Sequence, residues 1–431
     1  MITAKAFAGK HYAVYGLARS GLATVEALLA SGARVTAWDG KEEVRAALPD
    51  GADLADLDAV DLAQFDSLVV TPGLPLNRHP IAARAREAGV EIIGDIELFA
   101  RARAELPPHK VVGITGTNGK STTTALVHHI LQTAGVPSLM GGNIGLPILS
   151  RDPLPEGGVY VLELSSYQID LTQSLDCDVA VLLNITPDHL DRYENFEGYR
   201  DSKIRLLDIQ GHDHLAVVAT NNDELTEVVM AMTTGAELTQ WFGGNYETDF
   251  ATEQNHWPSL QGPHNAQNAW AARITCLSLG ISRSRINLGF RNFPGLPHRM
   301  ERIREKDEVA FVNDSKATNA TATAPALAAF PAIRWICGGQ AKADHLDECA
   351  PFFGHVRQAY TIGEASELFA RILAPHVKVA ECGDLAHAVL RAAHDAQPGE
   401  TVLLSPACAS FDQFRDFEAR GDAFRTLVGA L

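Results

Sequence analysis

The sequence lacks any long apolar run. None of the 431 residues lies in a stretch approaching the ~18–20 consecutive apolar residues that a membrane-spanning helix requires. The first residues, MITAKAFAGKHYAVYG, contain neither the long apolar core nor the small-residue cleavage site of an export signal. We therefore expect a cytoplasmic protein that does not insert into a membrane.

Cysteines are few and scattered, and basic residues are outnumbered. The six cysteines include no C-x-x-C pair, so they predict neither a disulfide framework nor a cysteine metal site, and we interpret them as core residues.

The chain has 36 Lys and Arg against 53 Asp and Glu, a net charge of −17. This balance argues against non-specific binding of nucleic acid or anionic lipid. It does not exclude anionic small ligands, because salt screens distant carboxylates.

Strand and helix signals alternate through the whole chain, which predicts parallel sheets. The first group contains the strands HYAVYG, RVTAWD and SLVVTPG, and the second contains VVGIT, GVYVLELSS, DVAVLLNIT and HLAVVAT. The third contains EVAFVND, AIRWICGG, QAYTIG, VKVAECG and TVLLSP. We predict an α/β fold of three consecutive domains, 1–95, 96–296 and 297–431. The first and third are Rossmann-like, and the central one has a P-loop-type parallel sheet.

The stretch VVGITGTNGKSTTTALV has the form of a phosphate-binding loop between a strand and a helix. Glycines let backbone N–H groups turn toward an anion, and the N-terminus of the helix adds its positive dipole. Lys120 would supply charge for the terminal phosphates, and Ser121 or Thr122 a hydroxyl ligand for Mg²⁺. The loop departs from G-x-x-x-x-G-K-[ST] at one position, where Ile114 replaces the first glycine.

A second glycine turn, GLARSG, follows the first strand and precedes a helix. Ala18 replaces the central glycine of G-x-G-x-x-G, so the turn alone does not identify a dinucleotide site. Asp39 ends the next strand, where a dinucleotide fold places its ribose-binding acid. Thr71-Pro72-Gly73 ends a later strand on the same expected edge. A nucleotide site and a βα turn without a ligand both remain open interpretations.

Two more polar side chains are expected beside the lysine loop. Glu163 stands near the end of the strand GVYVLELSS, and His189 follows the strand DVAVLLNIT. The carboxyl ends of parallel strands meet at one edge of a sheet, so both side chains should face the loop. A carboxylate at that position can reach Mg²⁺ directly or through water. The alternative for each is a purely structural role.

The strings TGTNGKST, LELSSYQ, NITPDHLDRY and GPHNAQN together resemble the Mur ligases, cytoplasmic ATP-dependent amide synthetases of peptidoglycan precursor assembly. VNDSKATNA and LLSPACASFDQF resemble the members of that family that add D-glutamate. The resemblance extends from about Ala13 to Gly421 and covers all three predicted domains. It implies that the first domain binds UDP and the second binds ATP and Mg²⁺. The third would carry D-glutamate and close against the second before the chemistry.

The resemblance also implies roles for individual residues. The UDP substrate would contact Arg19, Ser20, Gly21, Asp39, Thr71, Pro72, Gly73 and Asn143. ATP would contact Gly116, Thr117, Asn118, Gly119, Lys120, Ser121, Thr122, Asn268, Arg299 and Asp314. The metal ligands would be Ser121, Glu163, His189 and, once N-carboxylated, Lys203. D-glutamate would contact Lys316, Thr318, Lys342, Ser410 and Phe417. Lys120, His189, Lys203 and Lys342 would be catalytic.

The implied reaction joins D-glutamate to UDP-N-acetylmuramoyl-L-alanine through an acyl phosphate. The implied cofactors are ATP and Mg²⁺, with two ions bound and Mn²⁺ as a substitute. The expected partners are these two substrates alone, with no nucleic acid and no membrane, and we expect a monomer. Judged from the residues alone, Lys203 is a solvated lysine, and its carboxylation rests only on the resemblance. A protonated amine, with a reference pKa of about 10.4, cannot ligate Mg²⁺.

Other functions remain as alternatives. Within the same family these are a folylpolyglutamate synthetase or a sibling that adds another amino acid. The G-x-G-x-x-G turn usual in siblings that add L-alanine is absent, as is the Asp-Asn-Pro-Arg box of those that add diaminopimelate. A nicotinamide-dependent oxidoreductase would leave Lys120, Glu163 and His189 unexplained. A nucleotide-dependent switch would make the third domain superfluous, and no N/TKxD guanine motif is apparent.

Overall fold

The computed structural model describes residues 1–188, 192–218, 237–240, 250 and 253–431. The chain forms two compact units. The first comprises Met1–Gly243 and Trp270–Asn287, and the second comprises Gly244–Ala269 and Leu288–Leu431. Within the described part of the chain, no helix is long and apolar enough to cross a membrane. The cysteines are buried except for Cys382, which is half-buried, so they are core residues as predicted.

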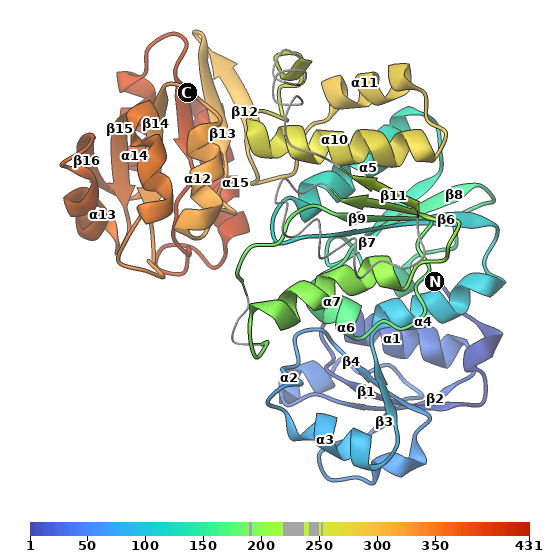
Figure 1. The fold of residues 1–431 in the computed structure, drawn as a ribbon. Coiled ribbons are helices and arrows are strands. Elements are labelled where there is room, and N and C mark those ends of the chain that lie inside the picture. Colours follow the sequence, from blue (N-terminus) through green and yellow to red (C-terminus); the bar gives the residue numbers. More distant parts are fainter. Residues whose placement is uncertain (189–191, 219–236, 241–249, 251–252) are drawn as a thin grey trace. The chain divides into compact units, whose positions relative to one another are not determined.

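The first unit begins with a five-stranded parallel sheet in the order β3-β2-β1-β4-β5 (Figure 1). Its strands are β1 (His11–Tyr15), β2 (Arg34–Trp38), β3 (Asp53–Leu54), β4 (Ser67–Val70) and β5 (Glu91–Ile93). Its helices are α1 (Arg19–Ala30), α2 (Glu42–Arg45), α3 (Pro80–Glu87) and α4 (Asp95–Ala102). Tyr12 and Val14 of β1 face one apolar cluster, and Ala13 and Tyr15 face another. This alternation shows that both faces of the sheet are covered.

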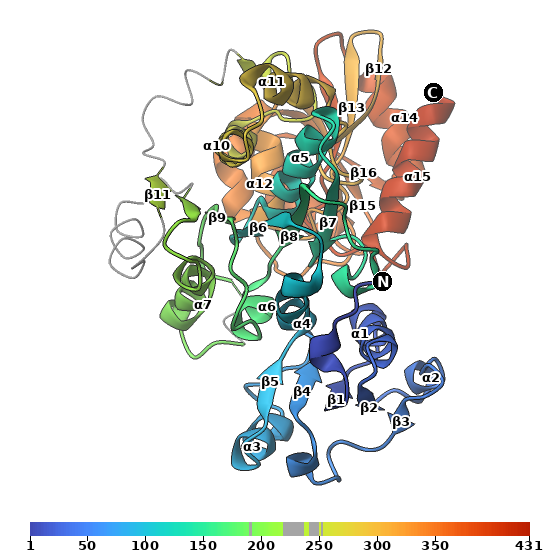
Figure 2. The ribbon, with the colours of Figure 1, turned by 90° about the vertical axis from the view of Figure 1, so that its right-hand side faces the viewer.

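A six-stranded parallel sheet follows in the same unit, in the order β11-β10-β9-β6-β8-β7. Its strands are β6 (His109–Thr115), β7 (Ser138–Gly142), β8 (Gly158–Glu163), β9 (Val179–Leu182), β10 (Leu215–Val218) and β11 (Glu237–Gln240). The helices α5 (Lys120–Thr133), α6 (Ser166–Asp170) and α7 (Phe196–Asp208) lie wholly in this unit, whereas α10 (Pro263–Ser278) and α11 (Arg283–Asn292) each contain residues of both units. Helix α5 packs on one face of this sheet and α7 on the other (Figures 1 and 2). The loops that follow β6, β8 and β9 therefore meet at one edge.

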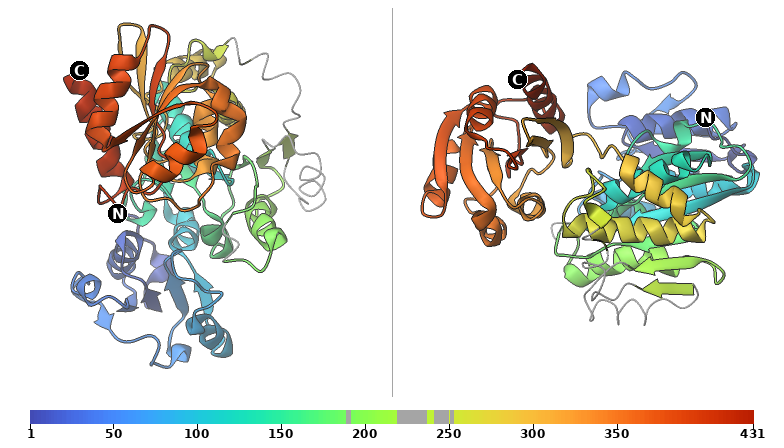
Figure 3. Two further views of the ribbon diagram at one scale, coloured as in Figure 1. Left: turned by 90° about the vertical axis from the view of Figure 1, so that its left-hand side faces the viewer. Right: turned by 90° about the horizontal axis from the view of Figure 1, so that it is seen from above.

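The second unit contains the third sheet, in the order β12-β13-β17-β14-β15-β16. Its strands are β12 (Glu301–Lys306), β13 (Val309–Asn313), β14 (Ile333–Gly338), β15 (Val356–Ile362), β16 (Lys378–Gly383) and β17 (Thr401–Leu404). Its helices are α12 (Ala320–Ala328), α13 (Ser366–Leu373), α14 (Leu385–Asp395) and α15 (Phe417–Ala430), which cover both faces of the sheet (Figure 3). Only the β12–β13 pair is antiparallel.

The predicted fold class is confirmed: three sheets, each covered by helices, follow one another along the chain. The strands β3, β5, β7, β11 and β12 were not predicted. The sequence of β12, ERIREK, alternates charged and apolar residues only weakly, and none of its side chains is fully buried. A strand that pairs along only one edge needs little apolar sequence, so its signal is faint.

Candidate functional site

The loop between β6 and α5 adopts a backbone conformation that requires glycine. Gly116 and Gly119 have φ angles of 151° and 84°, and Gly119 is the left-handed N-cap of α5. A Cβ added to Gly116 would lie 3.0 Å from the Leu183 Cβ, so a side chain would also be crowded there. The loop thus brings the backbone close to the end of β9 and directs the N-terminus of α5 at the edge of the sheet.

Two lysine side chains converge on this loop. Lys120 Nζ donates to the carbonyl oxygens of Gly116 at 2.9 Å and Thr117 at 2.8 Å. Lys203 Nζ, from α7, donates to the same Gly116 oxygen at 2.9 Å and lies 4.6 Å from the Tyr199 ring centre. The structure therefore brings together two lysines that are 83 positions apart in the sequence.

Lys203 is buried, with only 2% of its surface exposed. Burial first, and then the neighbouring Lys120 charge, lowers the pKa of Lys203 to about 7, against the opposing charge of Asp188. At neutral pH a large fraction of this amine is therefore uncharged and nucleophilic. The interpretation of Lys203 as a solvated surface lysine is wrong, because α7 turns this residue toward the core.

Asn184 and Thr186, in the segment that follows β9, hold the loop, and neither was predicted as a site residue. The Asn118 amide donates to Asn184 Oδ1 at 2.8 Å, and Asn184 Nδ2 donates back to the Asn118 carbonyl at 3.1 Å. The Thr117 hydroxyl bonds with both the amide and the carbonyl of Thr186. A signal was available, because NIT directly follows a buried strand whose end faces the loop.

Glu163 stands at the end of β8, as predicted, and is 2% exposed. Its Oε1 accepts a hydrogen bond from Asn143 Nδ2 at 2.8 Å, and its carbonyl accepts one from the Asn143 amide at 2.8 Å. Its Oε2 is buried and has no hydrogen-bond partner in the described part of the chain. A buried carboxylate oxygen without a donor is the group that a bound cation would satisfy.

The residues implied as Mg²⁺ ligands fit that cation in part. Oxygen donors from Glu163, Ser121 and a carboxylated Lys203 match the hard ligands that Mg²⁺ prefers. Ser121 is buried in the first turn of α5, and the Glu163 charge acts on Lys203. No group of three or more His, Cys, Asp and Glu side chains suited to a metal occurs among the described residues. His189 lies outside them.

The first sheet carries the second predicted turn, between β1 and α1. Gly16 has a φ of 96°, and a Cβ there would overlap the Thr71 hydroxyl. A Cβ on Gly21 would overlap the Gly16 carbonyl oxygen. The structure thus brings the GLARSG turn and the Thr71-Pro72-Gly73 loop into direct contact, as the sequence predicts.

Polar contacts within this turn involve the predicted residues Asp39 and Arg19. Asp39 accepts hydrogen bonds from the Leu17 amide at 2.8 Å and the Lys41 amide at 2.9 Å. One Arg19 nitrogen donates to the Gly145 carbonyl at 3.2 Å, two residues from Asn143. Asp39 therefore orders the turn, and Arg19 connects it to the Asn143 loop. Ser20 lies in the first turn of α1, where its carbonyl accepts a bond from Thr24.

In the second unit, Asp314 follows β13 and is buried. It accepts hydrogen bonds from the Ser405 hydroxyl at 2.8 Å and the Met300 amide at 3.2 Å. Burial raises the pKa of Asp314 to about 7. Arg299 lies between His298 and Met300, which have φ angles of 62° and 48°. This strained backbone fixes where the Arg299 side chain leaves the chain.

The residues predicted for D-glutamate form two pairs in the second unit. Lys316 Nζ lies 3.9 Å from the Phe417 ring centre, and Lys342 Nζ lies 3.5 Å from the Thr318 hydroxyl. Ser410 is buried.

Buried Arg420, which was not predicted, donates to the carbonyls of Ser315, Cys408 and Ala409. Its guanidinium holds together the two segments that carry Lys316 and Ser410.

Asn268, which was predicted to contact ATP, is buried and donates to Asn265 Oδ1 at 3.1 Å.

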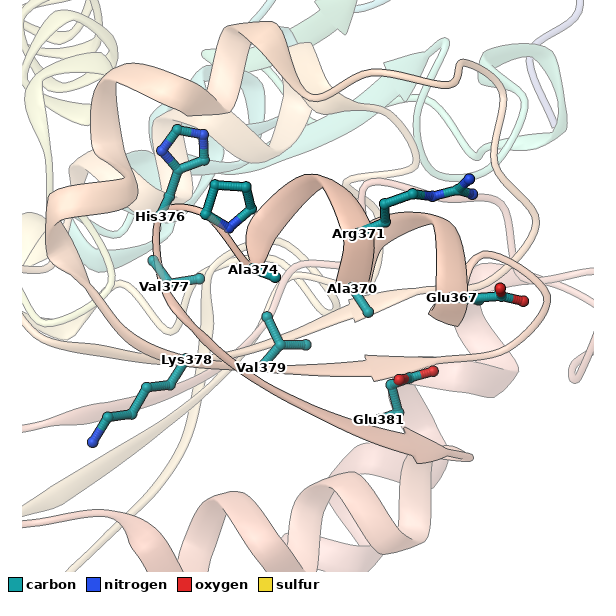
Figure 4. Close-up of a pocket in the computed structure, with 10 residues that line it drawn as sticks. Glu367, Ala370, Arg371, Ala374, His376, Val377, Lys378, Val379 and Glu381 are labelled. Atoms are coloured by element: carbon teal, nitrogen blue, oxygen red, sulfur yellow. The ribbon is translucent and has the colours of Figure 1, made fainter.

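The second unit also has an open depression that none of the predicted residues lines. It lies along α13 and the edge strand β16 (Figure 4). Charged groups from both elements line it, with Glu367 and Arg371 on the helix and Lys378 and Glu381 on the strand. The mixture of charges selects no single class of ligand.

Three protein-family models match the chain in sequence order. They are the MurD-like N-terminal domain over residues 10–94, the Mur ligase middle domain over 114–276 and the Mur ligase glutamate ligase domain over 298–408. Together they account for all three sheets.

Similar proteins extend over the whole chain. Relatives from Novosphingobium aromaticivorans and Sphingopyxis alaskensis, both named UDP-N-acetylmuramoylalanine–D-glutamate ligase, are 60% identical over 100% of this chain and 97% and 100% of theirs. The MurF ligase from Thermotoga maritima, solved in complex with ADP, has the same fold. Its TM-score is 0.61 at 17% identity, over 98% of this chain and 96% of that one.

Proposed function

This chain belongs to the Mur ligase family, and on that premise we propose that it joins D-glutamate to UDP-N-acetylmuramoyl-L-alanine. ATP is converted to ADP and phosphate, in the cytoplasm, during peptidoglycan precursor synthesis. The observation that carries the proposal is the convergence of Lys120 and Lys203 on one carbonyl. Relatives at 60% identity support D-glutamate as the amino acid. We propose a monomer with domains 1–95, 96–296 and 297–431.

The first step activates the acceptor. A carboxylate does not react with an amine in water at a useful rate, because oxide is a poor leaving group. The γ-phosphoryl group therefore moves from ATP to the terminal carboxylate oxygen of the acceptor, and ADP leaves. Lys120, the loop amides and the N-terminus of α5 stabilise the charge that develops on the phosphoryl oxygens. Asn268, Arg299 and Asp314 would contact the rest of the nucleotide.

Ser121, Glu163, His189 and Lys203 in its carboxylated form would hold Mg²⁺. When bound, the metal neutralises phosphate charge and polarises the phosphoryl group. The neutral Lys203 amine, favoured by its pKa of about 7, adds to CO₂ and releases a proton to give the carbamate. That product supplies the negative oxygen donors that a protonated lysine lacks.

The second step forms the amide. The D-glutamate amine attacks the acyl phosphate carbon, and the tetrahedral intermediate collapses to the amide and free phosphate. Lys316 and Lys342 would pair with the two carboxylates of D-glutamate, and Ser410 would donate a hydrogen bond. Thr318 and Phe417 hold these lysines in place.

The acceptor's uridine nucleotide would lie at the first-sheet turn, and its muramoyl group at Asn143. Arg19, Ser20, Gly21 and Asp39 form one side of the proposed nucleotide site. Thr71, Pro72 and Gly73 form the other side.

The test is phosphate release from ATP with one amino acid supplied at a time. We expect release with D-glutamate and the UDP-N-acetylmuramoyl-L-alanine acceptor together, and no turnover with L-glutamate, L-alanine or NADH. Release that is independent of the amino acid would contradict the proposal. Release with another amino acid would assign the chain to another ligation.

A further inference from the structure

Arg192, just before α7, contacts the first sheet from the second-sheet part of the same unit. Its Nη1 donates to the Gly73 carbonyl at 3.2 Å, and its Nη2 donates to those of Pro72 at 3.2 Å and Leu74 at 2.9 Å. One side chain thus binds three consecutive carbonyls of the loop that follows β4. The string NITPDHLDRY contains this arginine, but the proposed function gives it no role.

Aromatic side chains fix the orientation of the guanidinium. The Arg192 Cζ lies 4.2 Å from the ring centre of Tyr167, on α6. Tyr167 stacks on Tyr193 with the ring centres 6.1 Å apart and the planes at 19°. The Tyr193 hydroxyl donates in turn to Asp170 at 2.8 Å and lies 3.2 Å from the Ser202 hydroxyl. The arginine is therefore held by α6 and α7 before it meets the loop.

The loop is held on its other side by the glycine turn. The Thr71 amide donates to the Tyr15 carbonyl at 3.1 Å, and the Leu74 amide donates to the Thr71 carbonyl at 3.0 Å. Thr71 also fills the space that side chains on Gly16 and Gly21 would need. The conformation of Pro72 to Leu74 is then set jointly by this packing and by Arg192.

We propose that Arg192 is a positioning residue for the UDP-bearing substrate. It holds the carbonyls of Pro72, Gly73 and Leu74 so that the loop and the glycine turn together receive the nucleotide. This inference rests on the proposed function for its choice of ligand. A planar guanidinium can serve three carbonyls at once, whereas the single ammonium of lysine cannot keep that geometry.

Steady-state kinetics separates this role from a general structural one. We expect Arg192→Ala and Arg192→Lys to raise KM for UDP-N-acetylmuramoyl-L-alanine about tenfold or more, with kcat and the KM values for ATP and D-glutamate changed about twofold or less. Arg200→Ala is the matched control. Arg200 is an arginine of α7 whose guanidinium bonds to the adjacent Asp201 at 2.8 Å, and we expect wild-type constants.

Hydrogen–deuterium exchange of the ligand-free protein tests the contact without relying on ligase activity. We expect the amides of Thr71, Gly73, Leu74 and Leu76 to exchange about tenfold faster in Arg192→Ala and Arg192→Lys, and at the wild-type rate in Arg200→Ala. If the two Arg192 variants exchange faster but the wild-type protein has no ligase activity, the proposed function is rejected and the loop contact is kept. Unchanged exchange, or wild-type constants in Arg192→Lys, would overturn the role of Arg192.

Discussion

The two glycine turns of the first unit share one backbone plan but differ in charge. Each follows a central parallel strand and begins a helix, α1 in one case and α5 in the other. The first turn is closed by contacts among Gly16, Gly21 and Thr71, and the Asp39 carboxylate binds the Leu17 amide. At the second turn the side-chain nitrogens of two lysines donate to one carbonyl oxygen.

This difference indicates that the strand–turn–helix unit supplies a scaffold and the side chains around it select the ligand. A triphosphate that must transfer its terminal group needs concentrated positive charge, which Lys120 provides. A nucleotide that is bound but does not react needs only a binding surface of complementary shape and backbone N–H groups that donate hydrogen bonds.

Removing the lysine of the second turn should have the largest effect. We expect Lys120→Ala to lower kcat/KM for ATP about 1,000-fold or more, because the transferred phosphoryl group loses its principal counter-charge. The measurement is D-glutamate-dependent phosphate release, with thermal melting to verify folding. Lys110→Ala, an exposed lysine on β6, is the control. Normal turnover of Lys120→Ala would remove the ATP assignment.

The activity lost on removal of the Lys203 side chain should be partly restored by an added carboxylic acid. We expect Lys203→Ala to lose about 100-fold in activity, since a proposed metal ligand is gone. Formate or acetate should restore part of that loss by supplying carboxylate oxygens in the space left by the side chain. Full activity without added acid would refute a metal-bridging role for Lys203.

Substrate binding at the first turn should be sensitive to the size of the side chain at Gly21. We expect Gly21→Ala to raise KM for the UDP substrate about tenfold and to leave KM for ATP unchanged, because the new methyl group forces the Gly16 carbonyl to move. Gly40→Ala is the control, since nothing lies within 4 Å of a Cβ added at that position. Equal KM values for the two variants would show that the turn tolerates a shift.

The buried Lys203 amine should also make the stability of the protein depend on pH. The folded-state pKa of Lys203 is lowered from 10.5 to about 7, so between these values the folded protein binds fewer protons than the unfolded chain. The stabilising contribution of the neutral Lys203 amine is fully present above pH 10.5 and is lost as the pH falls through 7. Between these values the free energy of unfolding changes by up to about 1.4 kcal/mol per pH unit.

Lys203→Met should remove that slope. Melting temperatures from pH 7.5 to 9.5 in CO₂-free buffer would measure it. The melting temperature of the wild type should rise relative to that of the variant as the pH rises, because only the wild type loses the cost of a buried charge. A constant difference would mean that Lys203 keeps its ordinary pKa in the folded protein.

Much of this contrast could be predicted from the sequence. Buried strands with continuous apolar residues identified the cores of the sheets, and GTNGKST with its helix identified the lysine loop. Glu163 was placed correctly at a strand end because the continuous apolar run before it predicts a buried strand. Local patterns carry such information when one element alone determines the outcome.

Tertiary contacts between distant segments could not be predicted from local patterns. Nothing in YRDSKIRL indicates that Lys203 is buried, because the orientation of α7 depends on its packing against β6 and β9. The sequence around Arg192 does not distinguish it from a surface arginine, because its hydrogen-bond partners lie in the distant loop that follows β4. The edge strand β12 has no strong apolar signal because part of its surface remains solvated.

Transfer of oxygen during the reaction tests the central claim most directly. The acceptor would be labelled with ¹⁸O in its terminal carboxylate and turned over with ATP and D-glutamate. Activation through an acyl phosphate predicts that each released phosphate carries one labelled oxygen. Released phosphate without label would contradict the account, because the carboxylate oxygen would never have been bonded to phosphorus.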